Sequence, residues 1–165
     1  MRRRPPTTSM EASPGLLKHL RRVRIGIIRA EYNAEITQSL EAKCLQGLQE
    51  AGLSRRQINC YSVPGCFEIP IFAQKVAARK KYDLLIALGA VIRGDTLHFE
   101  LVANECARGV MEVSLKFNIP IVFEVLATHS HRDAARRAGN NRLNKGFEAA
   151  RAAVTMLAAL EGIRG

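Results

Sequence analysis

The segment from Gly89 to Glu100 carries the residues best suited to chemistry in this sequence. It reads Gly-Ala-Val-Ile-Arg-Gly-Asp-Thr-Leu-His-Phe-Glu and continues an apolar run, 84–88, that is typical of a buried parallel strand. An amphipathic segment follows, so Gly94 is expected in a turn between a strand and a helix. Ligands of open α/β sheets bind at the carboxyl ends of strands, and a helix N-terminus favours an anion. A single histidine, His98, falls in the first turn of that helix, which is the arrangement expected of an active site.

Two further strand ends carry unusual polar or glycine-rich sequences. Tyr32-Asn33 follows the first expected strand, and Pro64-Gly65-Cys66-Phe67-Glu68 follows the second. Parallel strands point the same way, so these segments are expected at the same edge of the sheet as Gly94. A fourth group, 137–139 with 144–146, flanks the start of the last helix. Loops that converge from one edge indicate a small-molecule site rather than a nucleic-acid footprint.

Several familiar ligand motifs are absent. There is no GxGxxG and no Walker loop, so dinucleotide or NTP binding has no support. There is no HExxH and no cluster of carboxylates, which argues against a catalytic metal, and His129 and His131 are interpreted as exposed loop residues. The four cysteines form no CxxC pair and lie in apolar contexts, so we expect buried or half-buried free thiols in a reducing cytosol.

Apolar periodicity predicts alternating strands and helices. Strands are expected at 23–29, 58–63, 84–91 and 121–126, and helices at 34–51 (with Asn33 as the cap), 68–79, 99–117, 133–138 and 144–160. Strands joined by helices of this length form right-handed crossovers. The expected fold is a three-layer α/β/α sandwich with a flavodoxin-like, parallel, four-stranded central sheet.

Length and charge limit the class of protein. The chain has 165 residues and a net charge of +10, and residues 1–24 contribute +6 of that charge. We expect a basic, flexible tail at 1–15 and one domain at 16–165. The tail is interpreted as solvated, with weak polyanion binding left open and no specific nucleic-acid partner. No apolar run approaches the ~18 residues of a membrane span. No apolar h-region follows the basic start, so a cytoplasmic protein is expected, with a transit-peptide fragment as the alternative.

Three sequence blocks together resemble the lumazine synthase family of riboflavin biosynthesis. They are Val63-Pro64-Gly65-Cys66-Phe67-Glu68-Ile69-Pro70, the segment 88–99, and Asn144-Lys145-Gly146-Phe147-Glu148-Ala149-Ala150. The resemblance covers about 16–162. It implies the condensation of 5-amino-6-(ribitylamino)pyrimidinedione with 3,4-dihydroxy-2-butanone 4-phosphate to 6,7-dimethyl-8-ribityllumazine, with release of phosphate and water. It implies no cofactor and no metal.

The resemblance also assigns roles to residues. His98 is the proton shuttle, and Arg137 holds the phosphate with the amides of Gly94, Asp95 and Thr96. Tyr32 stacks on the substrate and Glu68 accepts bonds from the ribityl chain. The remaining substrate-binding positions are Cys66, Phe67, Val91, Ile92, Phe123 and Lys145. In the family, Phe123 and Arg137 come from the neighbouring subunit.

Each role has a structural alternative that the sequence leaves open. His98 is otherwise a structural histidine, Arg137 a surface helix arginine, Phe123 strand core, and Lys145 a helix-cap cation paired with Glu148. Four residues depart from the family pattern, namely Tyr32, Asp95, Glu124 and Ala127. The functional alternatives are a non-catalytic flavin- or lumazine-binding or shell-forming relative, and an anion- or nucleic-acid-binding module driven by the tail. Members of the family form homopentamers, and in some members twelve pentamers assemble into a hollow shell. The sequence does not distinguish between these two assemblies.

Overall fold

A computed structural model describes residues 20–163, so the expected tail at 1–15 lies outside the described residues. The elements follow in the order β1 (Ile25–Ala30), α2 (Ala34–Glu50), β2 (Ile58–Val63), α3 (Ile69–Ala77), β3 (Leu84–Ile92), α4 (His98–Phe117), β4 (Ile121–Thr128), α5 (His131–Arg137) and α6 (Lys145–Gly162). Two short 3-10 turns, η1 (Arg55–Gln57) and η2 (Cys66–Glu68), precede β2 and α3.

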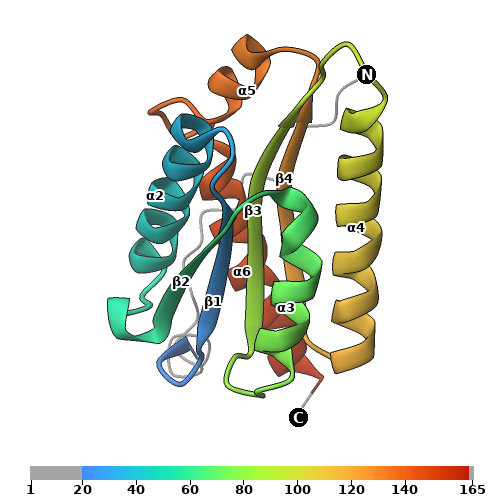
Figure 1. The fold of residues 1–165 in the computed structure, drawn as a ribbon. Coiled ribbons are helices and arrows are strands. Elements are labelled where there is room, and N and C mark those ends of the chain that lie inside the picture. The colour runs from blue at the N-terminus through green and yellow to red at the C-terminus, as the bar shows by residue number, and fades with distance from the viewer. Residues whose placement is uncertain (1–19, 164–165) are drawn as a thin grey trace.

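The four strands form one parallel sheet in the order β2-β1-β3-β4. Helices α2, α5 and α6 cover one face, and α3 and α4 cover the other (Figure 1). The predicted three-layer α/β/α sandwich is therefore confirmed. The sequence of β3, Leu-Leu-Ile-Ala-Leu-Gly-Ala-Val-Ile, is almost entirely apolar because helices bury both of its faces.

Helices α2 and α6 cross at unusually close range. A Cβ atom added to Gly146 would lie 2.1 Å from the Leu40 carbonyl oxygen, and one added to Gly47 would lie 2.7 Å from the Ala150 Cβ. The N-terminus of α6 is capped by the buried Asn144, whose side chain accepts a hydrogen bond of 2.7 Å from the Gly146 amide. In the third sequence block, Gly146 therefore permits the close approach of α6 to α2, and Asn144 caps the start of α6.

The ends of several elements differ from the sequence-based expectation. Strand β4 continues past the expected end at 126 to Thr128, because Ala127 and Thr128 pair with the last two residues of β3. Helix α5 starts at His131 rather than 133, since the Ser130 side chain accepts a hydrogen bond from the Asp133 amide and caps it. The helix expected at 68–79 is a 3-10 turn followed by α3, which ends at Ala77.

The cysteines behave as predicted. Cys44, Cys66 and Cys106 are buried, Cys60 is half-buried, and all four thiols are free. Among the helices of residues 20–163, none combines the length and the apolar character that crossing a membrane requires.

Candidate active site

Hydrogen bonds between loops hold the carboxyl ends of the four strands in register. The amides of Glu31 and Tyr32, after β1, donate to the carbonyls of Val63 and Pro64 at 2.8 and 3.1 Å. On the other side, the Arg93 amide after β3 donates to the Thr128 carbonyl at 2.9 Å. We call the loops 31–33, 64–68 and 93–98 the rim, which lies at the upper end of the sheet in Figure 1. The three strand ends that the sequence singled out therefore lie side by side.

Asn33 positions the rim in a way that the sequence analysis missed. It occupies the N-cap position of α2, as expected, but its side chain makes no capping bond. Its backbone is left-handed, with φ 58° and ψ 50°, and its Nδ2 donates to the Ala90 carbonyl at 2.9 Å. The prediction of Asn33 as the cap residue of this helix is therefore confirmed by its position, but the left-handed backbone, which asparagine tolerates, turns its side-chain amide toward β3 instead of the helix.

Cys66 lies beneath the rim rather than on its surface. It is buried, and a Cβ on Gly89 would come within 2.5 Å of its Sγ, so β3 and η2 approach closely only because residue 89 is glycine. Burial raises the pKa of the Cys66 thiol to about 11, although the Ala90 backbone opposes the shift. The thiol is therefore protonated near neutral pH and does not act as a nucleophile there.

Phe67 and Glu68 directly follow that buried thiol in sequence and are more accessible. Phe67 is 58% exposed, and Tyr32 on the neighbouring loop is 74% exposed. A Cβ on Gly65 would lie 3.0 Å from the Glu68 Oε2, which places that carboxylate over the Pro64-Gly65 turn. The rim therefore presents the rings of Tyr32 and Phe67 to solvent, with the partly exposed Glu68 carboxylate beside Phe67.

The turn from Gly94 to His98 is the expected anion site, and it is open. Every residue in it is exposed, and nothing lies within 4 Å of a Cβ added to Gly94. Within residues 20–163, the amides of Gly94, Asp95 and Thr96 donate to no protein acceptor. Helix α4 begins at His98, whose own amide donates to the Thr96 Oγ1 at 3.4 Å. Backbone amides without a protein acceptor in front of a helix start are groups that a phosphate can bind.

Val91 and Ile92 complete the rim at the end of β3. Both are partly buried, and they pair with Ala127 and Thr128 of β4. Their position between the Asn33 bond and the Gly94 turn is the one expected for backbone contacts to a substrate.

Phe123 does not reach the rim within one chain, and the hydrogen bonds and ion pairs of Arg137 and Lys145 are to Asp133 and Glu148, outside the rim loops. Phe123 pairs with Ala87, five residues before the end of β3, which corresponds to ~16 Å along the strand. It lies on the edge strand and is 39% exposed. Phe123 is therefore not a buried core residue of its strand, which was the structural alternative to a substrate-binding role.

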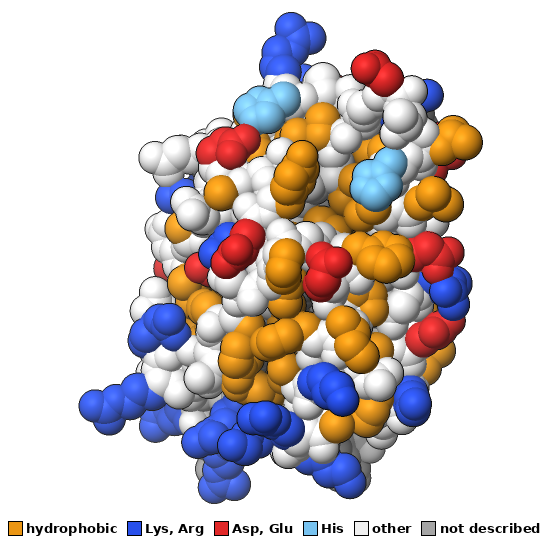
Figure 2. Space-filling view, in the orientation of Figure 1, with side chains coloured by type: hydrophobic (Ala, Val, Ile, Leu, Met, Phe, Trp, Pro, Cys, Tyr) orange, Lys and Arg blue, Asp and Glu red, His pale blue; other side chains and the backbone are white. Residues whose placement is uncertain are grey.

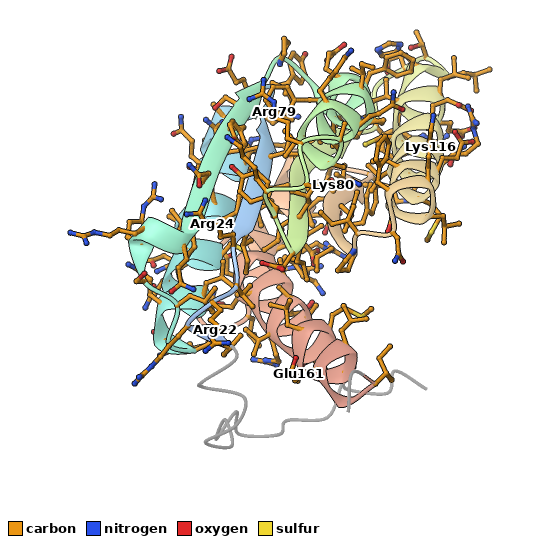
Figure 3. The ribbon with its side chains drawn as sticks, turned by 90° about the horizontal axis from the view of Figure 1, so that it is seen from below. Arg22, Arg24, Arg79, Lys80, Lys116 and Glu161 are labelled. Atoms are coloured by element: carbon orange, nitrogen blue, oxygen red, sulfur yellow. The ribbon has the colours of Figure 1, made fainter. Side chains whose placement is uncertain are left out.

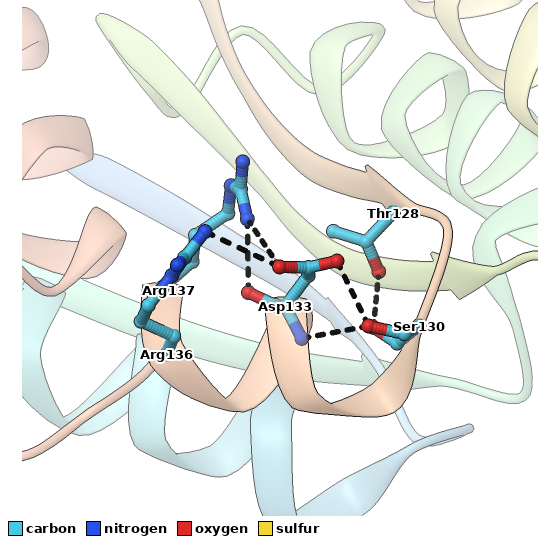
Figure 4. Close-up of polar contacts among 5 residues, drawn as sticks. All are labelled: Thr128, Ser130, Asp133, Arg136 and Arg137. Carbon is cyan, nitrogen blue, oxygen red and sulfur yellow. Dashed lines mark hydrogen bonds and ion pairs between the residues drawn. The ribbon is translucent and has the colours of Figure 1, made fainter.

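Arg137 is held by its own helix (Figure 4). Its Nη1 donates to the Asp133 carbonyl at 3.0 Å and lies 4.0 Å from the Asp133 Oδ1, while Arg136 Nη2 lies 3.2 Å from the same oxygen. The Ser130 hydroxyl donates to Asp133 Oδ2 at 2.8 Å, and this bond, with the neighbouring arginines, lowers the pKa of that carboxyl. Within one chain, Arg137 therefore makes the contacts expected of a surface arginine on a helix, which is the structural alternative to a phosphate-binding role.

Lys145 forms an ion pair with Glu148, as its structural alternative predicted. It also faces Glu124 of β4, which lies on the α6 side of the sheet and not in the phosphate turn. Burial raises the pKa of the Glu124 carboxyl to about 7, Lys145 opposes this shift and Glu148 adds to it. Lys145 therefore groups with Phe123 at the β4 edge rather than with the rim.

The candidate site is thus present as two half-sites. The rim half-site consists of the rim loops together with Val91 and Ile92 at the end of β3. The edge half-site consists of Phe123, Arg137 and Lys145. Large apolar side chains stand exposed on the face of α3 and α4 between them (Figure 2). Those with more than half of their surface exposed are Ile71, Leu101, Met111 and Leu115.

The histidines near the rim do not form a metal site in the described part of the chain, where no group of three or more potential ligands is close enough together. His131 Nε2 instead lies 2.7 Å from the Glu35 Oε1, and this contact joins α5 to α2.

Comparison with known families agrees with this geometry. Residues 22–161 match the family model described as 6,7-dimethyl-8-ribityllumazine synthase. The match spans every element of the sheet and both half-sites. The chain belongs to the 6,7-dimethyl-8-ribityllumazine synthase family.

Proposed function

We propose that this chain catalyses the condensation of 5-amino-6-(ribitylamino)pyrimidinedione with 3,4-dihydroxy-2-butanone 4-phosphate to 6,7-dimethyl-8-ribityllumazine, with release of phosphate and water. Family membership supports an enzyme of riboflavin biosynthesis. The observation that carries the proposal is the open turn of Gly94, Asp95 and Thr96, whose amides have no acceptor among residues 20–163, with His98 two residues after it. A phosphate ester bound at these amides would place its carbon chain within reach of one imidazole.

The proposed steps need proton transfer and no change of redox state. The 5-amino group of the pyrimidinedione adds to the ketone and a first water leaves, the phosphate is then eliminated, and the resulting enol tautomerises to a new carbonyl. The ring closes when the ribitylamino nitrogen adds to this carbonyl and a second water leaves. His98 accepts and returns the proton at each step. Its exposure leaves both ring nitrogens accessible to a substrate.

Other rim residues bind and orient the pyrimidine substrate. Tyr32 stacks on the heterocycle, and the buried Cys66 supports the turn on which Phe67 stands. Glu68 accepts hydrogen bonds from ribityl hydroxyls, and the backbone groups of Val91 and Ile92 bond to the ring edge. Asn33 acts as a positioning residue, because its bond to Ala90 fixes the distance between the first and third loops.

We further propose that the active form is a homo-oligomer, namely the pentamer of the family, in which the edge half-site of one copy meets the rim of the next. The exposed apolar side chains on α3 and α4 support association. In the assembly, Arg137 adds a guanidinium to the phosphate turn, Phe123 adds a second stacking ring, and Lys145 adds a further cation. We propose a cytoplasmic location, consistent with four free thiols.

The proposal is tested by mixing the purified protein with the two substrates and following lumazine absorbance and phosphate release. One phosphate is expected for each lumazine formed. Binding of lumazine or riboflavin with no turnover above the uncatalysed rate would instead assign the chain to the non-catalytic alternative. Deletion of residues 1–15 is expected to leave turnover nearly unchanged, whereas a module driven by the basic tail would lose its function.

A further inference from the structure

A second concave site lies at the opposite end of the sheet from the rim. It is a cavity of about 360 Å³ between β2 and α3, which we call the basic cavity. Strand β1 is six residues long, so about 20 Å separate the two ends of the sheet. None of the residues assigned to either half-site lines the cavity. Its volume falls in the range of sites for small molecules.

Among residues 20–163, four cations line the basic cavity and no carboxylate does. Arg24 precedes β1, Lys75 and Arg79 lie on or just after α3, and Lys81 lies in the turn before β3. All four are exposed, and none forms an ion pair with another residue of 20–163. Asp83 is the nearest acid in sequence, and its Oδ2 accepts a hydrogen bond of 2.8 Å from the Arg24 amide.

The figures show the same concentration of charge. Lys and Arg side chains gather at the lower end of the molecule in Figure 2, below a band of apolar side chains. Figure 3 views this end directly and shows Arg24 and Arg79 near the starts of the strands, with Lys116 separate from them on α4. The cations around the cavity therefore come from two segments that are distant in sequence, Arg24 and the stretch 75–81.

The wall of the cavity is aromatic. The Tyr61 ring lies 5.3 Å from the Phe72 ring and 6.3 Å from the Tyr82 ring, the latter at 89°. The hydroxyls of Tyr61 and Tyr82 lie 2.5 Å apart. Burial raises the pKa of Tyr82 to about 12, with Arg24 and Arg79 opposing the shift, so its phenol keeps its proton. The cavity thus combines hydroxyl donors and apolar surface with a cationic entrance.

We propose that the basic cavity binds a small organic phosphate, with the phosphate among Arg24, Lys75, Arg79 and Lys81 and an apolar or planar body against Phe72 and the two tyrosines. Unpaired guanidinium groups suit a phosphate dianion, which accepts several charge-assisted hydrogen bonds. The chain's own basic N-terminal residues cannot fill the cavity favourably, because their charge has the same sign. The limited volume favours one small molecule over a nucleic-acid strand.

The test is isothermal titration of phenyl phosphate into protein that carries Arg137→Ala, a substitution chosen to weaken the proposed rim phosphate site. About one molecule is expected to bind per chain, more tightly than inorganic phosphate. Adding Arg24→Gln and Arg79→Gln is expected to weaken phenyl phosphate binding by at least about 10-fold, since each removes a hydrogen bond from a charged donor. Lys116→Gln is the matched control, because it removes one charge from the same end of the molecule without touching the cavity.

Three outcomes would overturn the proposal. They are no binding of phenyl phosphate, an equal loss of affinity in the Lys116→Gln protein, and equal affinities for phenyl phosphate and inorganic phosphate. If phenyl phosphate does not bind and single-stranded RNA binds equally well to the wild type and the Arg24→Gln/Arg79→Gln protein, the basic surface makes only nonspecific contacts with polyanions. Lumazine formation by the Arg24→Gln/Arg79→Gln protein with Arg137 intact is expected to stay near wild type, so failure here is distinct from failure of the proposed enzyme activity.

Discussion

Replacing Gly146 by alanine tests the contact that seats α6 on α2. The new Cβ would lie 2.1 Å from the Leu40 carbonyl oxygen and 2.9 Å from the Cys44 amide nitrogen, and both atoms belong to the α2 backbone. Backbone atoms cannot rotate away as a side chain can, so the two helices must separate. Overpacking of this kind costs about 1–3 kcal/mol, and we expect the upper end of that range because the obstacle is main chain.

A gain in helix propensity partly offsets this cost. Alanine is favoured over glycine inside a helix by about 1 kcal/mol, which leaves a net loss of about 2 kcal/mol. For a chain of this size the loss corresponds to a fall in Tm of roughly 4–8 °C. The matched control is Gly162→Ala at the end of the same helix, where nothing lies within 4 Å of the added Cβ. The control is expected to be neutral or stabilising.

The assay is thermal unfolding followed by circular dichroism, with all three proteins at the same concentration because association shifts the apparent Tm. A Gly146→Ala protein that melts at or above the wild-type temperature would refute the close-contact argument. A fall no larger than that of Gly162→Ala would do the same.

Three further predictions concern the charged groups. Burial raises the pKa of Glu124 to about 7 from an ordinary 4.5, so the folded state holds this proton more tightly than the unfolded chain, and stability falls as pH rises through this interval. Glu124→Gln should remove that fall and make the protein more stable by up to about 3 kcal/mol near pH 8 but not near pH 4. Urea unfolding at both pH values measures the free energy of unfolding of each protein. The same pH dependence of this free energy in both proteins would contradict the prediction. His98→Ala should lower turnover by ~10²–10⁴, while His129→Ala, which removes another exposed histidine, should not; equal rates for both would discard the proton-shuttle role. Arg137→Ala should raise KM for the phosphate substrate far more than KM for the pyrimidine, whereas Arg136→Ala on the same helix should change neither by much, and matching effects of the two variants would exclude a specific phosphate contact.

Local patterns in the sequence were sufficient to predict most of the fold. The apolar run of β3 and the apolar stripe of α4, which repeats every 3.6 residues, each show which side chains are buried. The kind of element and its position could therefore be predicted directly from these patterns. Element ends were less predictable because they depend on distant partners. Strand β4 reaches Thr128 only because the end of β3 is there to pair with it.

The rim half-site was also foreseen, since it consists of short segments that directly follow predicted strands. The role of Asn33 was not, because a capping bond and a left-handed backbone favour the same residue type, and only the position of Ala90 distinguishes them. The separation of Phe123 from the rim depends on strand register, which no local pattern reveals. The proximity of Lys145 to Glu124 depends on how α6 packs against β4. The basic cavity was likewise invisible, because Arg24 and Lys81 are far apart in sequence and only the pairing of β1 with β3 brings them together.

The central claim is that a working site needs the rim of one copy and the edge of another. At a phosphate-substrate concentration well below the raised KM of the Arg137→Ala protein, His98→Ala and Arg137→Ala are each nearly inactive alone. They should therefore restore activity when they are co-assembled in equal amounts. If copies mix at random in a symmetric ring, about a quarter of the adjacent pairs combine an intact His98 with an intact Arg137, so lumazine formation should recover to about a quarter of the wild-type rate. A mixed assembly that turns over no faster than the sum of its two components would contradict the shared site.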